Sequence, residues 1–103
     1  MKRRLPVRIV ASAAEAIADA AKWWVENRPK APAAFAEELT RALDLVASEP
    51  AIGAKARNAK LPGLRRIHLA RIRYYLYYRV RSSPATLEVL ALWHSSRGSG
   101  PQL

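Results

Sequence analysis

Arginine and tyrosine alternate along one short segment, and this segment is the first candidate for a binding surface. Residues 73–81 are Arg-Tyr-Tyr-Leu-Tyr-Tyr-Arg-Val-Arg. Alternate side chains of a strand share a face, so one face would collect the arginines together with two tyrosines. Guanidinium groups interleaved with aromatic rings suit either nucleobase stacking or a bound peptide. The candidate residues on this face are Arg73, Tyr75, Tyr77, Arg79 and Arg81.

His94 and Arg97 are the candidates for catalysis. An imidazole can move protons near neutral pH, and an arginine can stabilise negative charge that develops in a transition state. A histidine at the end of a buried strand can equally be a hydrogen-bonded structural residue. The sequence has no cysteine and two histidines, which excludes thiolate zinc sites, cysteine nucleophiles and histidine-rich metal sites. We therefore expect no metal and no cofactor.

Positive charge is concentrated in the second half of the chain. The formal net charge is +10 over 103 residues. Residues 51–103 carry 10 lysines and arginines against the single acid Glu88, whereas residues 1–50 carry 8 against 7. The expected partner is therefore a polyanion, such as nucleic acid, an acidic protein segment or a membrane surface. The alternative is a charge that serves solubility alone.

Two helices are predicted in the first half of the chain. A β-branched strand at residues 7–10 precedes a capping box at Ser12 and Glu15, which predicts a helix from Ser12 to about Asn27. Trp23 falls at the edge of its apolar stripe, where it could anchor a partner. The stripe comprises Ala13, Ile17, Ala20, Ala21, Trp24 and Val25.

A second helix is expected from about Pro32 to Pro50, and the short linker predicts an antiparallel helical hairpin. Its apolar positions are Phe35, Leu39, Ala42, Leu43 and Val46, and its wet face comprises Glu37, Glu38, Arg41 and Asp44.

Three strands are predicted in the second half, at residues 64–70, 73–81 and 86–93, where the hydrophobic period changes to two. The last is apolar on both faces except at Glu88, so it should lie inside the sheet. Residues 51–61 should form a loop and residues 95–103 a flexible tail. The predicted order is β-α-α-β-β-β. This is a single α+β domain, residues 1–103, with the helical hairpin packed on a small, mostly antiparallel sheet.

One face of strand 73–81 must lie beneath the helices. Tyr74, Leu76, Tyr78 and Val80 form the more apolar row, and burying unpaired arginines instead would cost far more. The basic face should therefore point outward.

The basic N-terminus resembles a signal peptide only superficially, because Arg8, Glu15 and Asp19 interrupt the apolar run. No stretch approaches the roughly 18 uncharged apolar residues of a membrane span. We expect a cytoplasmic protein that does not enter membranes.

Three stretches occur together in one register. They are Leu61-Pro-Gly-Leu-Arg65, Tyr74-Tyr-Leu-Tyr-Tyr78-Arg-Val, and Leu92-Trp-His94-Ser-Ser-Arg97-Gly98. With them, the chain resembles the ParE/RelE superfamily of bacterial toxins from type II toxin–antitoxin modules over about residues 7–98. The resemblance implies the same α+β fold.

The resemblance implies one of two activities. RelE-like members are metal-independent ribonucleases that cut messenger RNA on the ribosome, whereas ParE-like members inhibit DNA gyrase without chemistry of their own. Tyr75 stands where the RelE pattern has an arginine, and no aromatic hydroxyl follows Arg97. The ending His94-Ser-Ser-Arg97 resembles the ParE branch. We therefore expect a gyrase-inhibiting toxin that is not an enzyme. The alternative is an endoribonuclease in which His94 and Arg97 act, and a third hypothesis is a basic nucleic-acid-binding module without toxicity.

The same resemblance implies a cognate antitoxin as partner, beside DNA gyrase. The antitoxin is expected to have a ribbon-helix-helix DNA-binding domain, through which alone the pair would reach operator DNA. Its acidic tail is expected to wrap the helical hairpin and the basic sheet face. The residues expected to contact target or antitoxin are Arg65, Arg66, Arg73, Tyr75, Tyr77, Arg79, Arg81, Arg97 and Trp23.

Overall fold

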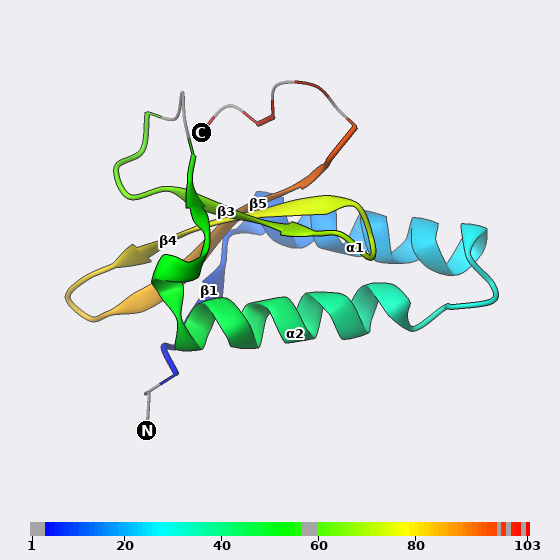
Figure 1. The fold of residues 1–103 in the computed structure, drawn as a ribbon, viewed down its shortest axis with the longest axis horizontal. Helices are drawn as coiled ribbons and strands as arrows, with labels where there is room; N and C mark the ends of the chain where they lie inside the picture. The colour runs from blue at the N-terminus through cyan, green and yellow to red at the C-terminus, as the bar shows by residue number, and fades with distance from the viewer. Residues whose placement is uncertain (1–3, 57–59, 97, 99, 102) are drawn as a thin grey trace.

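The computed structural model describes residues 4–56, 60–96, 98, 100–101 and 103. Two helices cover one side of a five-stranded sheet, and the described C-terminal residues 98, 100–101 and 103 lie on the other side (Figure 1). The α+β architecture with a helical hairpin on the sheet is the one that the sequence predicted. In chain order the elements are β1 (Val7–Ile9), α1 (Ala11–Asn27), α2 (Ala34–Ser48), the 3-10 helix η1 (Pro50–Ile52), β2 (Ala54–Lys55), β3 (Arg65–Leu69), β4 (Tyr74–Arg81) and β5 (Thr86–His94).

The strands lie in the order β1-β5-β4-β3-β2. β5 pairs with β1 in parallel, and the remaining pairs are antiparallel. β5 therefore occupies an interior position, as its apolar residues on both faces predicted. The expectation of an unbroken loop over residues 51–61 is wrong, because Ala54 and Lys55 pair with β3 as the edge strand β2. Two residues are too few to show an alternating pattern in the sequence.

The hydrophobic core lies between the helices and the inner face of the sheet, which is the face turned toward them. α1 packs mainly on β5, while α2 reaches β3. Leu76 and Tyr78 of β4 are fully buried in this core, and Tyr74 packs against it. The apolar row of β4 therefore faces the helices, as predicted. Val80 belongs to the same row but is 45% exposed, because the end of β4 extends beyond α2 (Figure 1).

The first helix begins before its predicted cap, so the capping box at Ser12 is wrong. Val10 is the N-cap residue, and no side chain caps the helix. The Val10 backbone N–H donates to the Val89 carbonyl oxygen at 3.1 Å, while the Ala14 N–H donates to the Val10 carbonyl oxygen at 2.9 Å. Val10 thus both continues the pairing of β1 with β5 and starts the hydrogen bonding of α1. Ser12 therefore falls inside the first helical turn.

Two helical side chains depart from the predicted faces. Val25 was expected in the apolar stripe but is 56% exposed, because the last turns of α1 extend beyond the sheet (Figure 1). Glu38 was expected on the wet face of α2 but is only 6% exposed. Both of its carboxylate oxygens accept hydrogen bonds from Arg41 Nη2 at 2.7 Å. The Arg41 side chain covers the Glu38 carboxylate and is itself 75% exposed. α2 also begins at Ala34, after a turn, rather than near Pro32.

A buried tyrosine hydroxyl fastens η1 to the sheet. Tyr78 Oη donates to the Pro50 carbonyl oxygen at 2.8 Å and accepts a hydrogen bond from the Gly53 backbone N–H at 2.9 Å. Arg65 Nη1 donates to the Gly53 carbonyl oxygen at 2.7 Å. Burial raises the pKa of the Tyr78 hydroxyl, and the Gly53 hydrogen bond and the Arg65 charge oppose this rise only in part. The neutral phenol therefore holds the segment before β2 in place.

None of the helices among the described residues has the length and apolar character that crossing a membrane requires.

Candidate functional site

The outer face of the sheet, turned away from both helices, carries three stacked side chains: Arg66, Tyr75 and His68, here called the Tyr75 stack. Arg66 Cζ lies 4.2 Å from the centre of the Tyr75 ring. The ring centres of His68 and Tyr75 are 4.7 Å apart, with an interplanar angle of 34°. The pairing of β3 with β4 produces this arrangement, because it places His68 directly opposite Tyr75. Arg66 and Tyr75 were predicted as binding residues, and His68 joins them.

Tyr77 lies on the same face but is covered by the chain itself. It is 6% exposed, and a Cβ on Gly100 would lie 2.9 Å from its hydroxyl oxygen. The Lys60 backbone N–H donates to the Leu103 carbonyl oxygen at 3.0 Å, and Figure 1 shows residues 100–101 and 103 on this side of the sheet. The expectation of an open Tyr77 is wrong, because C-terminal residues occupy its surroundings. The flexibility of residues 95–103 stays a prediction.

Arg79 and Arg81 share the carboxylate of Glu88. Arg79 Nε donates to Glu88 Oε1 at 2.9 Å, and Arg81 Nη1 lies 3.9 Å from Glu88 Oε2. The Arg79 side chain is 19% exposed and that of Arg81 is 59% exposed. Arg79 therefore neutralises a buried acid, while Arg81 remains accessible to a partner.

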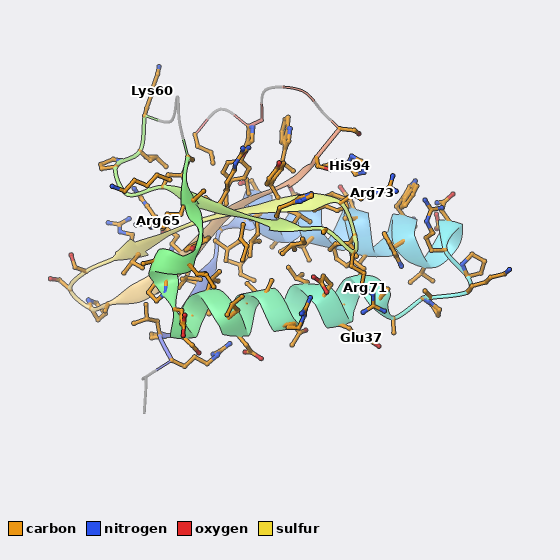
Figure 2. The ribbon with its side chains drawn as sticks, viewed as in Figure 1. Glu37, Lys60, Arg65, Arg71, Arg73 and His94 are labelled. Carbon is orange, nitrogen blue, oxygen red and sulfur yellow. The ribbon has the colours of Figure 1, made fainter. Side chains whose placement is uncertain are left out.

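Arg65 and Arg73 do not share the outer face. Arg65 pairs with Tyr78, whose side chain points into the core, so Arg65 lies on the inner side and binds the Gly53 carbonyl. Arg73 has a φ of 62° and precedes β4 rather than opening it. Placing Arg73 in the strand is wrong, because positive φ belongs to a turn and breaks the alternation of side chains. Its carbonyl oxygen accepts the Ser95 N–H at 2.9 Å, which brings Arg73 beside the end of β5 (Figure 2).

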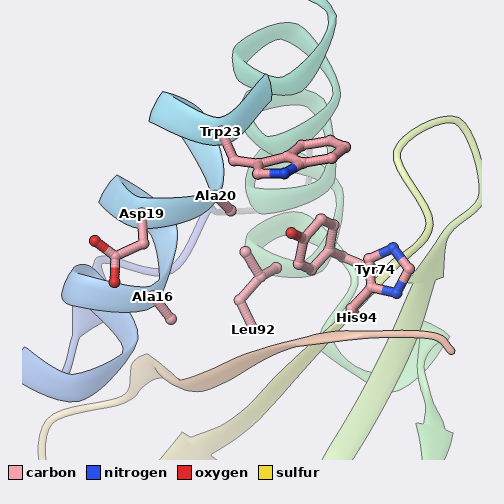
Figure 3. Close-up of a pocket in the computed structure, with 7 residues that line it drawn as sticks. All are labelled: Ala16, Asp19, Ala20, Trp23, Tyr74, Leu92 and His94. Carbon is pink, nitrogen blue, oxygen red and sulfur yellow. The ribbon is translucent and has the colours of Figure 1, made fainter. Parts of the chain in front are cut away.

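A groove opens between α1 and the ends of β4 and β5, with a volume of about 430 Å³ (Figure 3). Trp23 lies at the edge of the apolar stripe, as predicted; the residue is 46% exposed and lines the groove. Arg28 Cζ lies 5.2 Å from the centre of that ring. We call this the Trp23 groove, and it is lined by Ala16, Asp19, Ala20, Trp23, Tyr74, Leu92 and His94.

His94 is held at the end of the Trp23 groove. Its ring meets Tyr74 edge-on, with centres 5.0 Å apart. Its Nδ1 accepts a hydrogen bond from the Ser96 backbone N–H at 3.2 Å and lies 2.7 Å from Ser96 Oγ. Because a backbone N–H only donates, Nδ1 is an acceptor, and the neutral ring carries its proton on Nε2. These local contacts hold the His94 ring in place, and its role stays a prediction.

Arg97, the other catalytic candidate, lies outside the described residues. Among the residues that the structure does describe, no group of three or more histidine, aspartate and glutamate side chains could hold a metal ion.

The comparisons decide between the superfamily's branches. The model of the family described as "ParE toxin of type II toxin-antitoxin system, parDE" matches residues 7–98. The chain belongs to the ParE toxin family. It is thus a toxin of a type II system, and such a system implies a cognate antitoxin as partner.

A solved structure described as "Chromosomal ParDE TA system from P. aeruginosa" has the same fold as this ParE-family toxin. The TM-score is 0.69 at 16% sequence identity, and the match covers 88% of this chain and 96% of that chain. A search of curated proteins gives no match.

Sequence reasoning found Trp23 but missed the rest of its groove in this toxin. The available signal was the spacing of Ala16, Ala20 and Trp23, which places two small residues and an indole on one helical face. Tyr74 was expected beneath the helices and Leu92 in an interior strand, and both also line the groove because β4 begins and β5 ends beside α1.

Proposed function

We propose that this ParE-family toxin inhibits DNA gyrase and is held inactive by its cognate antitoxin. The observation that carries the proposal is the family match over residues 7–98, since gyrase inhibition is the activity that the ParE branch implies. The toxin would act by binding rather than by bond cleavage.

The surroundings of Tyr75 support an inhibitor over a ribonuclease. The RelE pattern needs an arginine at this position to stabilise charge on the reacting phosphate. Here a tyrosine ring stands in its place, and the nearby Arg66 guanidinium is stacked on that ring. His94, the remaining proton carrier, already has Nδ1 engaged by Ser96. The first arrangement lacks the arginine that would stabilise the phosphate, and the second leaves the neutral His94 ring without a further acceptor nitrogen to act as a base.

The Trp23 groove offers the antitoxin an apolar anchor point. Alanine and leucine side chains give it an apolar lining, and the Trp23 ring forms one wall (Figure 3). A partly exposed tryptophan beside a concave surface is a common centre of binding energy at protein interfaces. An aliphatic or aromatic side chain of the antitoxin would fill this space.

The surroundings of the groove select an acidic partner. Arg28 stacks on Trp23, and Arg73 is exposed near the other end, beside His94 (Figure 2). An acidic segment that folds on binding would place carboxylates beside these arginines while its apolar side chains enter the groove. The net charge of +10 would accelerate the encounter and make it sensitive to salt. A ribbon-helix-helix domain of the antitoxin would then bring the pair to operator DNA.

Controlled expression of the toxin without antitoxin tests the proposed target. We expect gyrase–DNA cleavage complexes to accumulate and supercoiling activity to fall, while messenger RNA stays intact. Fragmented messages with normal DNA supercoiling would overturn the proposal in favour of the ribonuclease.

Two single substitutions in α1 test whether the antitoxin binds in the Trp23 groove. Trp23→Ala should weaken co-purification with the antitoxin by at least tenfold, as expected of an aromatic anchor. Val25→Ala is the matched control, because Val25 is 56% exposed on the same helix and does not line the groove. Equal loss of antitoxin binding in both variants would contradict the assignment.

A further inference from the structure

We propose that the outer face of the sheet is a binding site for single-stranded nucleic acid, with nucleobases on the Tyr75 stack and phosphates beside neighbouring arginines. This goes beyond the gyrase and antitoxin interactions above. It uses side chains on the opposite side of the sheet from the Trp23 groove.

A row of ring systems crosses three adjacent strands. His68 on β3 pairs with Tyr75 on β4, and Tyr75 pairs with Trp93 on β5. Neighbouring strands lie about 4.8 Å apart, so the three side chains leave adjacent backbone positions on one face. His68 is exposed, and Tyr75 and Trp93 are partly exposed. Beside the covered Tyr77, these accessible aromatic side chains can stack unpaired bases, because every base offers a flat π-face.

The Tyr75 stack is ordered before any ligand arrives. Arg66 lies over the Tyr75 ring at 4.2 Å, and its Nη1 lies 3.4 Å from the Tyr77 hydroxyl oxygen. His68 packs on the same ring at 4.7 Å. A base that stacks on these side chains would therefore lose little of its binding energy to ordering them.

Two exposed arginines lie on the outer face, toward the opposite end of the strands from the rings. Arg81 is largely exposed, and Arg8 on β1 is exposed at the position paired with Glu88. Glu88 itself is neutralised by its 2.9 Å contact with Arg79. With Arg66 on the Tyr75 ring, the outer face therefore carries positive charge at the rings and at the far end of the strands, and a phosphate backbone that runs along the strands would meet both.

The rings distinguish nucleic acid from an acidic peptide. Carboxylates would engage Arg81 and Arg8 but would have no flat group to stack on His68 and Tyr75. Bases of a duplex are stacked on each other and unavailable to such a surface, so an unpaired strand fits best.

Fluorescence anisotropy of the full chain with a fluorescein-labelled 12-nucleotide oligo-dT tests the site. Tyr75→Leu removes the central ring and should weaken binding about tenfold, the effect of losing one stacked base. His68→Ala should also weaken binding, and because His68 is exposed this second variant keeps the test valid if the first one fails to fold. Tyr75→Phe retains the ring and should bind as the wild type does.

A matched pair of charge variants separates local contacts from overall charge. Arg81→Gln and Lys22→Gln each remove one positive charge, but Lys22 lies on α1, on the helical side. Arg81→Gln should reduce the salt slope by about 0.7, as for one lost phosphate contact on a single strand, while Lys22→Gln should not.

Three outcomes would overturn the proposal. The first is that the oligonucleotide does not bind. The second is that Arg81→Gln and Lys22→Gln weaken oligonucleotide binding equally while the ring variants have no effect. The third is that poly-glutamate displaces the oligonucleotide and its own binding depends on Tyr75 in the same way. The last would reassign the face to an acidic protein. None of these results bears on gyrase, since toxicity and cleavage-complex accumulation are measured separately.

Discussion

Removing the Tyr78 hydroxyl should destabilise the fold without a change in its shape. Tyr78→Phe deletes two hydrogen bonds, to the Pro50 carbonyl and from the Gly53 N–H. A buried hydrogen bond contributes about 0.5–1.5 kcal/mol net, so the variant should lose about 2 kcal/mol of unfolding free energy. For a domain of this size, that corresponds to a decrease of about 8–16 °C in Tm.

The pH dependence gives the same prediction a second, independent readout. Burial raises the pKa of Tyr78 in the folded protein, whereas the unfolded chain releases this proton near pH 10. The stabilisation by the neutral phenol is therefore complete below about pH 10 and declines as the pH rises further, because only the unfolded state ionises. The stability difference between wild type and Tyr78→Phe should be constant from pH 7 to 9 and shrink above pH 10.

Urea denaturation followed by circular dichroism measures both effects. Tyr75→Phe is the matched control, since the Tyr75 hydroxyl has no hydrogen bond to another described residue, and this variant should change stability by less than about 0.5 kcal/mol. A Tyr78→Phe protein as stable as wild type, or a stability difference that does not change between pH 7 and 10.5, would refute the role given to this hydroxyl.

Three further predictions concern the neighbourhood of the site. Gly53→Ala should destabilise the fold by about 2 kcal/mol, because its Cβ would lie 2.5 Å from Tyr78 Oη and 2.8 Å from the Arg66 carbonyl oxygen. In the Tyr78→Phe background the loss of stability in thermal denaturation should be smaller, and full additivity would show that the clash with the Tyr78 hydroxyl contributes nothing. Glu88→Gln should cost about 1–2 kcal/mol in urea denaturation, because it leaves the mostly buried Arg79 without its carboxylate; an unchanged midpoint would show that this pair contributes nothing. Arg97→Ala should reduce toxicity while leaving the circular dichroism spectrum intact, and full toxicity would remove Arg97 from the functional surface.

The local pattern of the sequence determined the two helices, the strands β1, β3, β4 and β5, the interior place of β5 and the face of β4 that is buried. Alternation alone placed Tyr74, Leu76 and Tyr78 beneath the helices, because burying the arginine row would have cost far more. The resemblance of the motifs to ParE/RelE toxins is confirmed by the family match over residues 7–98. Strand alternation and short motifs each involve only a few neighbouring residues, so the sequence alone is sufficient to show them.

Contacts between distant parts of the chain decided which basic residues face a partner. Arg79 is paired with Glu88, and Arg65 donates a hydrogen bond to the Gly53 carbonyl. Gly100 lies against the Tyr77 hydroxyl. The stacking of His68 on Tyr75 depends on the register between two strands, and the Trp23 groove depends on where β5 ends beneath α1. Spacing along the chain does not reveal these contacts, because register and packing are fixed only when the helices and all the strands come together.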